Sequence, residues 1–304
     1  MSGTRAINII EVGPRDGFQS VSCGSIPTEQ KLQVIDGLAD AGVRHMEFTS
    51  FVSPKAIPQL ADAAQVTEQV LHKYPQLDLF ALVPNLRGAE NAYRAGLRKV
   101  VYVVSLSKSH NKANINRTHA QSLETFGQIR DAYPELEIIM DLATTFGCPF
   151  EGKYTDPTAV TAFLKDYVDM GLRACDLCDT IGIADPAQVR AFVSAVQDAY
   201  PELELHVHFH DTRGVGLVNT LTAMDMGVRN VQAALGGLGG CPFAPGASGN
   251  LSTEDLVWML NEMGYDTGID FSKLLAIAKK QVEMIAGNYS GHHIHIAKQT
   301  PCRA

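Results

Sequence analysis

Three histidines stand at alternate positions in one short segment of the sequence, His206-Val-His208-Phe-His210. Side chains two residues apart in a β-strand point to the same face, so His208 and His210 would lie side by side. Paired imidazoles at such a position suit a divalent ion such as Mg²⁺, Mn²⁺ or Zn²⁺. We therefore predict that His208 and His210 bind a metal. His206 shares their face one layer deeper, where we expect it to fill the interior.

A second candidate segment, EVGPRDG, lies near the N-terminus and places Arg15 beside Asp16. Gly13, Pro14 and Gly17 surround the two charges, so the segment reads as a fixed turn. A charged pair in a turn is often only a surface ion pair, which contributes little to stability. Taken alone, this segment leaves both interpretations open.

A long glycine-rich stretch, LGGLGGCPFAPGASGN, ends at Asn250 and carries Cys241 near its middle. Glycines allow unusual backbone angles and a mobile lid. Cys241 is therefore a candidate acid, base or reactive thiol, and the alternative is a flexible loop that happens to hold a thiol. Asn250 directly precedes a helical pattern, so its amide could cap that helix or offer an oxygen to a metal.

The elements that must position these residues alternate along the chain: short β-type runs are followed by amphipathic helical patterns. The strands are expected to begin near residues 7, 44, 77, 99, 136, 173, 203 and 228. Such alternation favours a parallel sheet, here an α/β fold closed into a (β/α)8 TIM barrel with extra C-terminal helices. No GxGxxG follows the first strand, which argues against the rival doubly wound sheet. We expect one catalytic domain over residues 1–304, with the barrel at about 6–265 and a helical extension at about 266–304.

Active sites in such barrels lie where strands end and βα loops begin. The Arg-Asp pair follows the first predicted strand, and the two histidines end the seventh. Two further acids occupy the same edge, since Glu47 ends the second strand and Asp179 the sixth. Isolated carboxylates at strand ends are often salt-bridge partners, but here they join the other candidates at one predicted mouth.

The composition limits the partners that this protein can have. Its net charge of −8 argues against a nucleic-acid partner, and no apolar run is long enough to cross a membrane. The N-terminus has no signal-peptide pattern, so we expect a cytoplasmic protein with reduced thiols. Cys175 and Cys178 form a CxxC, but a predicted strand carries them, so they are interpreted as two small barrel residues and not as a zinc or redox pair.

Together these segments resemble the 3-hydroxy-3-methylglutaryl-CoA (HMG-CoA) lyase family, in the metal-dependent aldolase-like barrel superfamily that also holds isopropylmalate synthase. The resemblance runs from about Ile7 to about Ile269 and includes EVGPRDG, TSFVSPK, GCPFEGK, DTIG, HFHDT and GGLGGCPFAPGASGNLSTEDLV. The cysteine-bearing loop is similar to the lyases in particular, because the synthases usually carry Gly-Glu-Arg there.

The resemblance implies a role for most of the candidates. A divalent metal, Mg²⁺ or Mn²⁺ with Zn²⁺ as an alternative, would be held by Asp16, His208, His210 and Asn250. The residues with catalytic or supporting roles would be Arg15, Asp16, Glu47, Asp179, His208 and Cys241. The residues expected near the bound acyl-CoA are Gln19, Asn111 and Asn114.

Some positions depart from the family pattern. Phe18 stands where the lyases usually have leucine, Asp176 and Cys178 replace a common serine and glycine, and Lys108 replaces a frequent glutamate. The loop after Gln19 also differs. None of these changes removes an expected ligand or catalytic residue, but all lie near the expected pocket, so the acyl specificity stays open.

The reaction that the resemblance implies is the retro-Claisen cleavage of HMG-CoA, or of a close 3-hydroxy-3-carboxyalkyl acyl-CoA, to acetyl-CoA and a 3-oxoacid. The alternatives are a lyase for another branched hydroxyacyl-CoA such as citramalyl-CoA, a Claisen-condensing synthase, and a non-catalytic ligand-binding barrel. The loop around Cys241 argues against the synthase, and the complete set of metal ligands argues against the non-catalytic barrel. The expected partners are an acyl-CoA and further copies of the chain, most simply one in a dimer.

Overall fold

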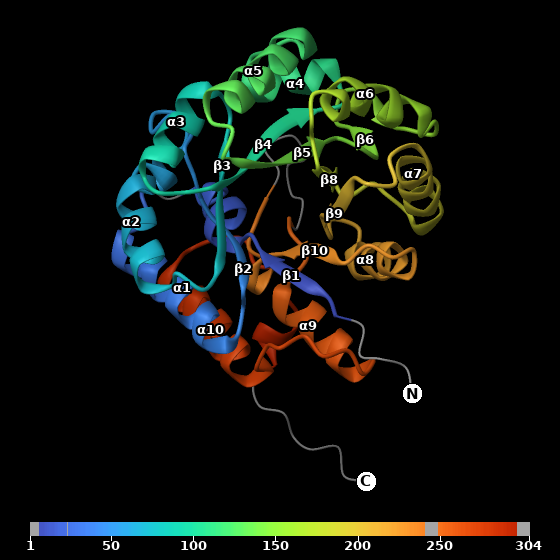
Figure 1. Cartoon of the computed structure of the whole chain (residues 1–304). Helices are drawn as coiled ribbons and strands as arrows, with labels where there is room; N and C mark the ends of the chain where they lie inside the picture. Colours follow the sequence, from blue (N-terminus) through green and yellow to red (C-terminus); the bar gives the residue numbers. More distant parts are fainter. Residues whose placement is uncertain (1–5, 23, 241–248, 297–304) are drawn as a thin grey trace.

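The computed structural model describes residues 6–22, 24–240 and 249–296. Eight parallel strands close into a barrel in the order β1-β10-β9-β8-β5-β4-β3-β2 (Figure 1). They are β1 (Asn8–Glu11), β2 (His45–Ser50), β3 (Asp78–Val83), β4 (Lys99–Ser105), β5 (Glu137–Ala143), β8 (Ala174–Asp179), β9 (Glu204–Phe209) and β10 (Asn230–Ala233). This confirms the predicted (β/α)8 TIM barrel, and each strand begins within two residues of its predicted start.

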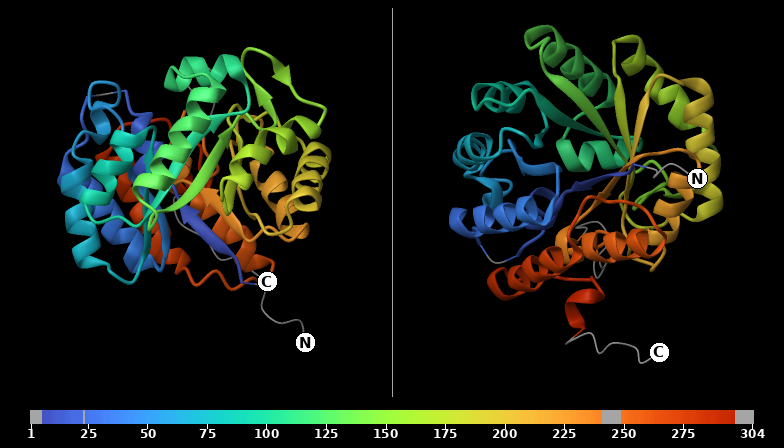
Figure 2. Two further views of the ribbon diagram at one scale, coloured as in Figure 1. Left: turned by 45° about the horizontal axis from the view of Figure 1, so that its top comes forward. Right: turned by 60° about the horizontal axis from the view of Figure 1, so that its bottom comes forward.

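Helices connect the strands and form the outer layer of the barrel (Figures 1 and 2). They are α1 (Thr28–Ala41), α2 (Ala63–Lys73), α3 (Leu86–Arg94), α4 (Lys108–Ile115), α5 (His119–Ala132), α6 (Thr158–Asp169), α7 (Pro186–Ala199), α8 (Gly216–Asp225), α9 (Thr253–Glu262) and α10 (Phe271–Met284). A small antiparallel hairpin of β6 (Gly147–Cys148) and β7 (Gly152–Lys153) follows β5. The last helix, α10, packs against α1 and α9 and so covers the side of the barrel where its first and last units meet.

Helix α1 illustrates how the sequence sets these outer elements. Its buried positions include Val34, Ile35 and Leu38, which recur every three or four residues and form one apolar stripe towards the sheet. The helix ends at Gly42, whose φ of 104° lies in the left-handed region that favours glycine. A side chain there would also meet the carbonyl oxygen of Gly268, because a Cβ would lie 2.4 Å from it.

The apolar core has two parts. The larger part fills the space between the sheet and the helices, and the smaller part plugs the inside of the barrel with Ile10, Val12, Phe80, Val101, Ile139, Ala174 and Ala234. Inward-facing side chains alternate along each strand, so the next inward positions towards the carboxyl ends of β5 and β8 are Asp141 and Asp176. The apolar plug inside the barrel is therefore followed by a polar layer at the carboxyl-terminal mouth.

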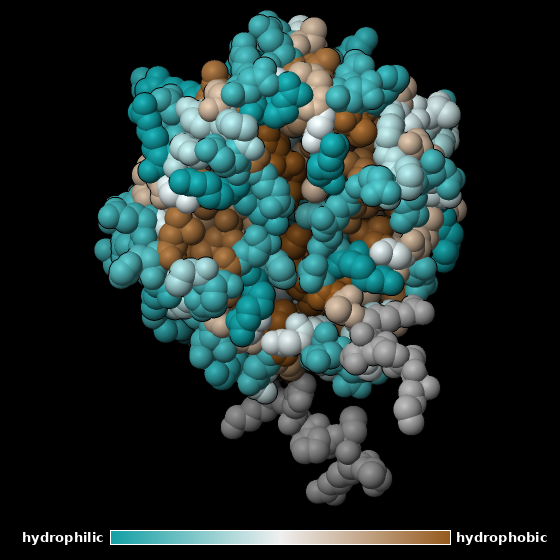
Figure 3. Space-filling view, in the orientation of Figure 1, coloured by the Kyte–Doolittle hydropathy of each residue, from teal (hydrophilic) through white to brown (hydrophobic). Residues whose placement is uncertain are grey.

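The face of the molecule seen in Figure 3 is mostly hydrophilic, with hydrophobic side chains visible in the hollows between polar ones. Within the described ranges, every helix is too short or too polar to cross a membrane.

Candidate active site

The chain turns sharply directly after β1, in the segment Gly13–Gly17. The backbone N–H groups of Arg15 and Asp16 both donate to the carbonyl of Val12, at 3.1 and 2.7 Å, and both side chains line the cavity at the mouth. Gly13 is needed for this turn, because a Cβ at that position would lie 2.5 Å from a carboxylate oxygen of Glu11. The local sequence thus brings two adjacent opposite charges to one point over the barrel.

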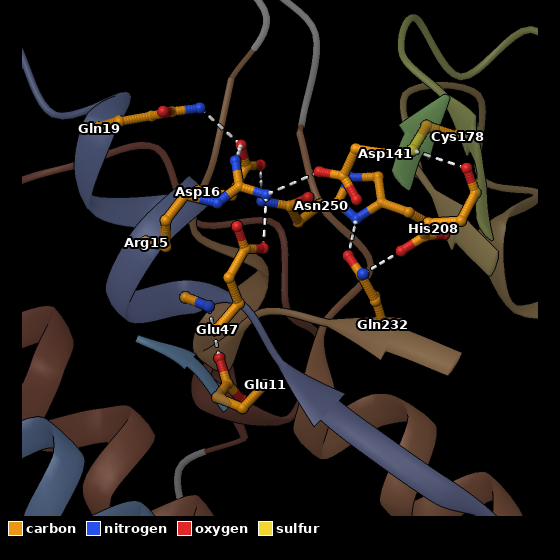
Figure 4. A network of polar contacts seen from close by, with 12 residues as sticks. Glu11, Arg15, Asp16, Gln19, Glu47, Asp141, Cys178, His208, Gln232 and Asn250 are labelled. Carbon is orange, nitrogen blue, oxygen red and sulfur yellow. Dashed lines mark hydrogen bonds and ion pairs between the residues drawn. The ribbon is translucent and has the colours of Figure 1, made fainter. Parts of the chain in front are cut away.

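Arg15 lies among three carboxylates (Figure 4). Its Nη1 is 2.6 Å from Oδ1 of Asp16, and its Nη2 is 2.7 Å from Oε2 of Glu47 and 3.6 Å from Oδ2 of Asp141. Burial opposes the charge of the guanidinium, but Glu47 and Asp16 together raise the pKa of Arg15 above its ordinary value. Arg15 is therefore a buried cation whose charge is permanent and whose orientation is fixed on two sides.

Asp16, His208 and His210 form a compact group in which one ligand atom from each residue lies within 4.8 Å of the others. Burial lowers the pKa of both histidines, that of His210 to about 4, so both rings are neutral at physiological pH. Burial alone would raise the pKa of Asp16, but Arg15 and the two histidines lower it to about 2. One ionised carboxylate and two neutral imidazoles are the ligand forms that a divalent metal requires.

Asn250 reaches the same point from the other end of the glycine-rich stretch. Its Nδ2 donates to Oδ2 of Asp16 at 2.8 Å and to the carbonyl of Leu238 at 3.1 Å. Its Oδ1 is buried and has no hydrogen-bond partner within the described ranges, and the same holds for Nδ1 of His210. Buried polar atoms are seldom left unpaired, so these orphaned acceptors fit a bound cation. The role of helix cap belongs to Ser252, whose side chain accepts from the N–H of Asp255.

A cavity of about 490 Å³ opens beside this group. Among the described residues of its wall, the charged cations are Arg15 and Arg117, and two of the three residues expected near the acyl-CoA, Gln19 and Asn114, also line it. Nε2 of Gln19 donates to Oδ1 of Asp16 at 2.6 Å, which links this wall to the candidate metal ligands. The cavity is large enough for an acyl chain, and it presents two cations to an anionic ligand.

Other expected residues lie elsewhere. The carboxylate of Asp179 accepts from the N–H groups of Ile183 and Ala184, at 2.9 and 3.0 Å, and so closes the loop after β8 instead of facing the metal ligands. The amide of Asn111 is buried and holds the loop after β4, since it accepts from the N–H of Ser105. Both side chains thus hold their own loops in this structure, and their expected catalytic and ligand-binding roles stay predictions. Cys241 lies outside the described residues.

The structure adds polar residues that the sequence did not single out as functional. Asp141, Asp176 and Cys178 face the inside of β5 and β8, and one ligand atom from each lies within 4.8 Å of the others. Burial, together with the charge of Glu47, raises the pKa of Asp141 to about 8 in spite of nearby Arg15. Cys175 packs in the outer apolar core whereas Cys178 lines the cavity, so the CxxC is no redox pair in this conformation.

A closed parallel barrel that carries a carboxylate, two imidazoles and a guanidinium at its carboxyl-terminal mouth has the architecture of a TIM-barrel enzyme with a divalent-metal site. Within that class the chain belongs to the HMGL-like family, which matches residues 6–280.

Characterised relatives and solved structures agree with this assignment. The chain is 42% identical over 273 residues to the mitochondrial hydroxymethylglutaryl-CoA lyase of Homo sapiens, an alignment that covers 89% of this chain and 83% of the relative. It is 38% identical over 298 residues to hydroxymethylglutaryl-CoA lyase YngG of Bacillus subtilis, covering 97% and 99%. The structure of an HMG-CoA lyase from Acinetobacter baumannii in complex with coenzyme A and 3-methylmalate superimposes with a TM-score of 0.91, at 40% identity and over 98% and 97% of the two chains.

Proposed function

We propose that this protein is a divalent-metal-dependent carbon–carbon lyase that splits HMG-CoA, or a close 3-hydroxy-3-carboxyalkyl acyl-CoA, into acetyl-CoA and a 3-oxoacid. The observation that carries the proposal is the group of Asp16, His208 and His210 beside Arg15 at the wall of the cavity. The names of the relatives support the substrate class, and the coenzyme A in one neighbouring structure supports an acyl-CoA ligand.

The residues that would hold the cation are Asp16, His208 and His210, with the amide oxygen of Asn250 beside them. A bound divalent cation supplies Lewis acidity, which polarises a substrate hydroxyl and lowers its pKa. We propose Mg²⁺ or Mn²⁺ as the ion, because oxygen ligands from Asp16 and Asn250 accompany the imidazoles.

Cleavage needs a base for the 3-hydroxyl proton and a cation for the charge that develops at the other end. The carboxylate of Asp16 takes the proton, and the electrons of the C2–C3 bond then move to the thioester side. This leaves a ketone on one fragment and the enolate of acetyl-CoA on the other. Arg15 lines the cavity, and it is the fixed cation that we propose for the enolate oxygen.

The enolate carbon must then receive a proton to give acetyl-CoA. Cys241 is our proposed donor, because a thiol is acidic enough to protonate a carbanion and the neighbouring Gly240 lines the cavity.

The test is acetyl-CoA release from HMG-CoA by protein stripped with a chelator and then titrated with Mg²⁺ or Mn²⁺. We expect no turnover without metal and saturable recovery with it. The variants His208→Ala and His210→Ala should lose the recovery. His206→Ala is the matched control, because His206 lies on the same strand and its ion pair among the described residues is with Glu204, at 3.6 Å, and not with a candidate metal ligand.

Acetyl-CoA release that persists in metal-free protein carrying both His208→Ala and His210→Ala would disprove the metal-dependent mechanism. A protein that binds metal but cleaves only citramalyl-CoA, or that only condenses acetyl-CoA with a 2-oxoacid, would keep the site and change the proposed substrate or direction.

A further inference from the structure

The second ring nitrogen of His208 lies in a buried chain of polar groups below the candidate metal site. Nδ1 of His208, on β9, is 2.8 Å from Oε1 of Gln232, on β10. Nε2 of Gln232 donates in turn to Oδ2 of Asp176, on β8. All three side chains are buried, with exposed fractions of 7%, 3% and 0%.

The register of the strands explains why these residues meet. Gln232 is level with His208 in the pairing of β10 with β9, whereas Asp176 is level with His206, one layer deeper. Inward side chains from both neighbours of β9 therefore close beneath the ring of His208. The contact needs three strands at once, so it is a property of the closed barrel and not of one sequence motif.

Chemistry then fixes the direction of each hydrogen bond. The Nε2 of Gln232 faces Asp176 and its Oε1 faces His208, so the amide donates to the carboxyl group and accepts from the imidazole. An amide oxygen only accepts, so Nδ1 of His208 must carry the hydrogen. Nε2 is then the nitrogen with a free lone pair, and it is the one that can meet Asp16 and His210.

We propose that Gln232 is a positioning residue, oriented by Asp176, that sets the Nε2 lone-pair tautomer of His208 and thereby the metal affinity of the site. This inference rests on the metal site proposed above. Metal-bound histidines usually donate their other N–H to a fixed acceptor, and loss of that acceptor typically weakens metal binding by about 10- to 100-fold.

The ring of His210 differs from that of His208 in this respect. Nδ1 of His210 has no such partner within the described ranges, so the orientation of that ring depends on its backbone, which pairs with Asn250. Gln232 thus acts on one of the two imidazoles only. The expected effect of its removal is weaker binding and not complete loss of the metal.

The experiment measures Mn²⁺ binding to the metal-free full-length protein by electron paramagnetic resonance of free Mn²⁺, without substrate. Gln232→Leu should weaken binding about 10- to 100-fold. The matched control is Asn230→Leu, which removes a buried amide two residues earlier on the same strand. Asn230 donates to Glu204 at 2.6 Å and makes no hydrogen bond to His208, so its loss should leave the Mn²⁺ affinity unchanged.

A charge-conserving exchange separates the hydrogen-bond role from packing. In the double variant Asp176→Asn with Gln232→Glu, the new amide donates and the new carboxylate accepts from His208, so the chain of bonds is restored. We expect its Mn²⁺ affinity to return to within a few-fold of the starting protein, while Asp176→Asn alone, in which the amide of Gln232 can reverse, should remain weak.

Long-range ¹H–¹⁵N correlation spectra of protein labelled on its histidine rings give a readout that does not involve metal. The metal-free protein should show His208 protonated at Nδ1, and this signal should shift in Gln232→Leu. A His208 protonated at Nε2, or a Gln232→Leu variant with unchanged Mn²⁺ affinity, would overturn the inference. If the unaltered protein itself fails to bind Mn²⁺, the proposed metal site is wrong instead.

Discussion

The residue with the most demanding surroundings is Arg15. It is buried, yet it remains charged because Asp16 and Glu47 accept from its two terminal nitrogens, at 2.6 and 2.7 Å. A planar guanidinium can serve two carboxylates at once and still offer a further N–H to a ligand, whereas an ammonium group presents one point charge. The shape of this group, and not only its charge, therefore holds the site together.

We predict that Arg15→Lys lowers kcat by roughly two or more orders of magnitude, as losses of comparable charge-stabilising donors do. Lysine keeps the positive charge but cannot bridge Asp16 and Glu47 and face the developing enolate together. Binding of Mn²⁺ should stay nearly intact, because Arg15 is not one of the proposed ligands. Steady-state kinetics and Mn²⁺ titration measure the two effects separately, and an Arg15→Lys protein with near-normal turnover would remove Arg15 from the mechanism.

At the scale of the elements, an inward-facing site residue can be predicted from the sequence only where the spacing along the strand reveals which face its side chain shares. His208 and His210 were recognisable because two like side chains at a spacing of two must share a face. Asp141 stands alone among the apolar residues that end β5, and a lone polar residue does not reveal which face points inward. Asp179 is the opposite case: it ends its strand as expected but follows the inward Cys178, so its side chain faces out of the barrel and into its own loop.

The long-range contacts of the site could not be predicted either. The order of strands and helices depends on local periodicity, which the sequence carries directly. The ion pairs of Arg15 with Glu47 and Asp141 join segments that are far apart in the chain, and only closure of the barrel brings them together. The strand-end pattern singled out Glu47 as a candidate, but it did not indicate Asp141.

Glu11 links the elements on the outer side of the same mouth. Its Oε1 accepts from the N–H groups of Gly13 and Leu235, at 2.7 and 2.8 Å, and its Oε2 accepts from the hydroxyl of Thr253 at 2.6 Å. One fully buried carboxylate thus ties β1 to the turn that carries Arg15, to the segment after β10 and to the start of α9.

We predict that Glu11→Ala lowers the free energy of unfolding by about 2–4 kcal/mol, because two backbone N–H groups and a hydroxyl would lose their acceptor inside the protein. The turn that holds Arg15 should loosen as well, so kcat should fall together with stability. Urea unfolding and kinetics on the same preparation check both effects. A loss below about 0.5 kcal/mol, the level of an ordinary surface substitution, would show that Glu11 does not hold these elements together.

At the scale of the whole molecule, the notable feature is the number of acids that folding removes from water. Burial raises the pKa of Asp141 to about 8 and those of Glu11 and Glu254 to about 7. Their ordinary values lie near 4, so at intermediate pH the folded protein binds protons that the unfolded chain has released. At intermediate pH, some of the carboxyl groups counted in the net charge of −8 are therefore protonated in the folded protein.

The direction of the resulting pH dependence follows from linkage. Where the folded state binds more protons than the unfolded state, the free energy of unfolding decreases as the pH rises. The stabilising contribution of these acids is complete below about pH 4 and is lost progressively until the pH passes their raised pKa values, near 7 and 8. We thus predict that the metal-free protein is less stable at pH 8 than at pH 6.

Asp141→Asn tests this directly, because asparagine has nearly the same shape and no charge to bury. The variant should be more stable than the unaltered protein at pH 8, by on the order of 1 kcal/mol, and the difference should shrink at pH 6. The control is Asp225→Asn, at the exposed end of α8, which should follow the unaltered protein at both pH values. Urea unfolding of the metal-free proteins at the two pH values gives the four comparisons. If Asp141→Asn is no more stable at pH 8 than at pH 6 relative to the unaltered protein, the carboxylate of Asp141 is not the buried acid that its surroundings indicate.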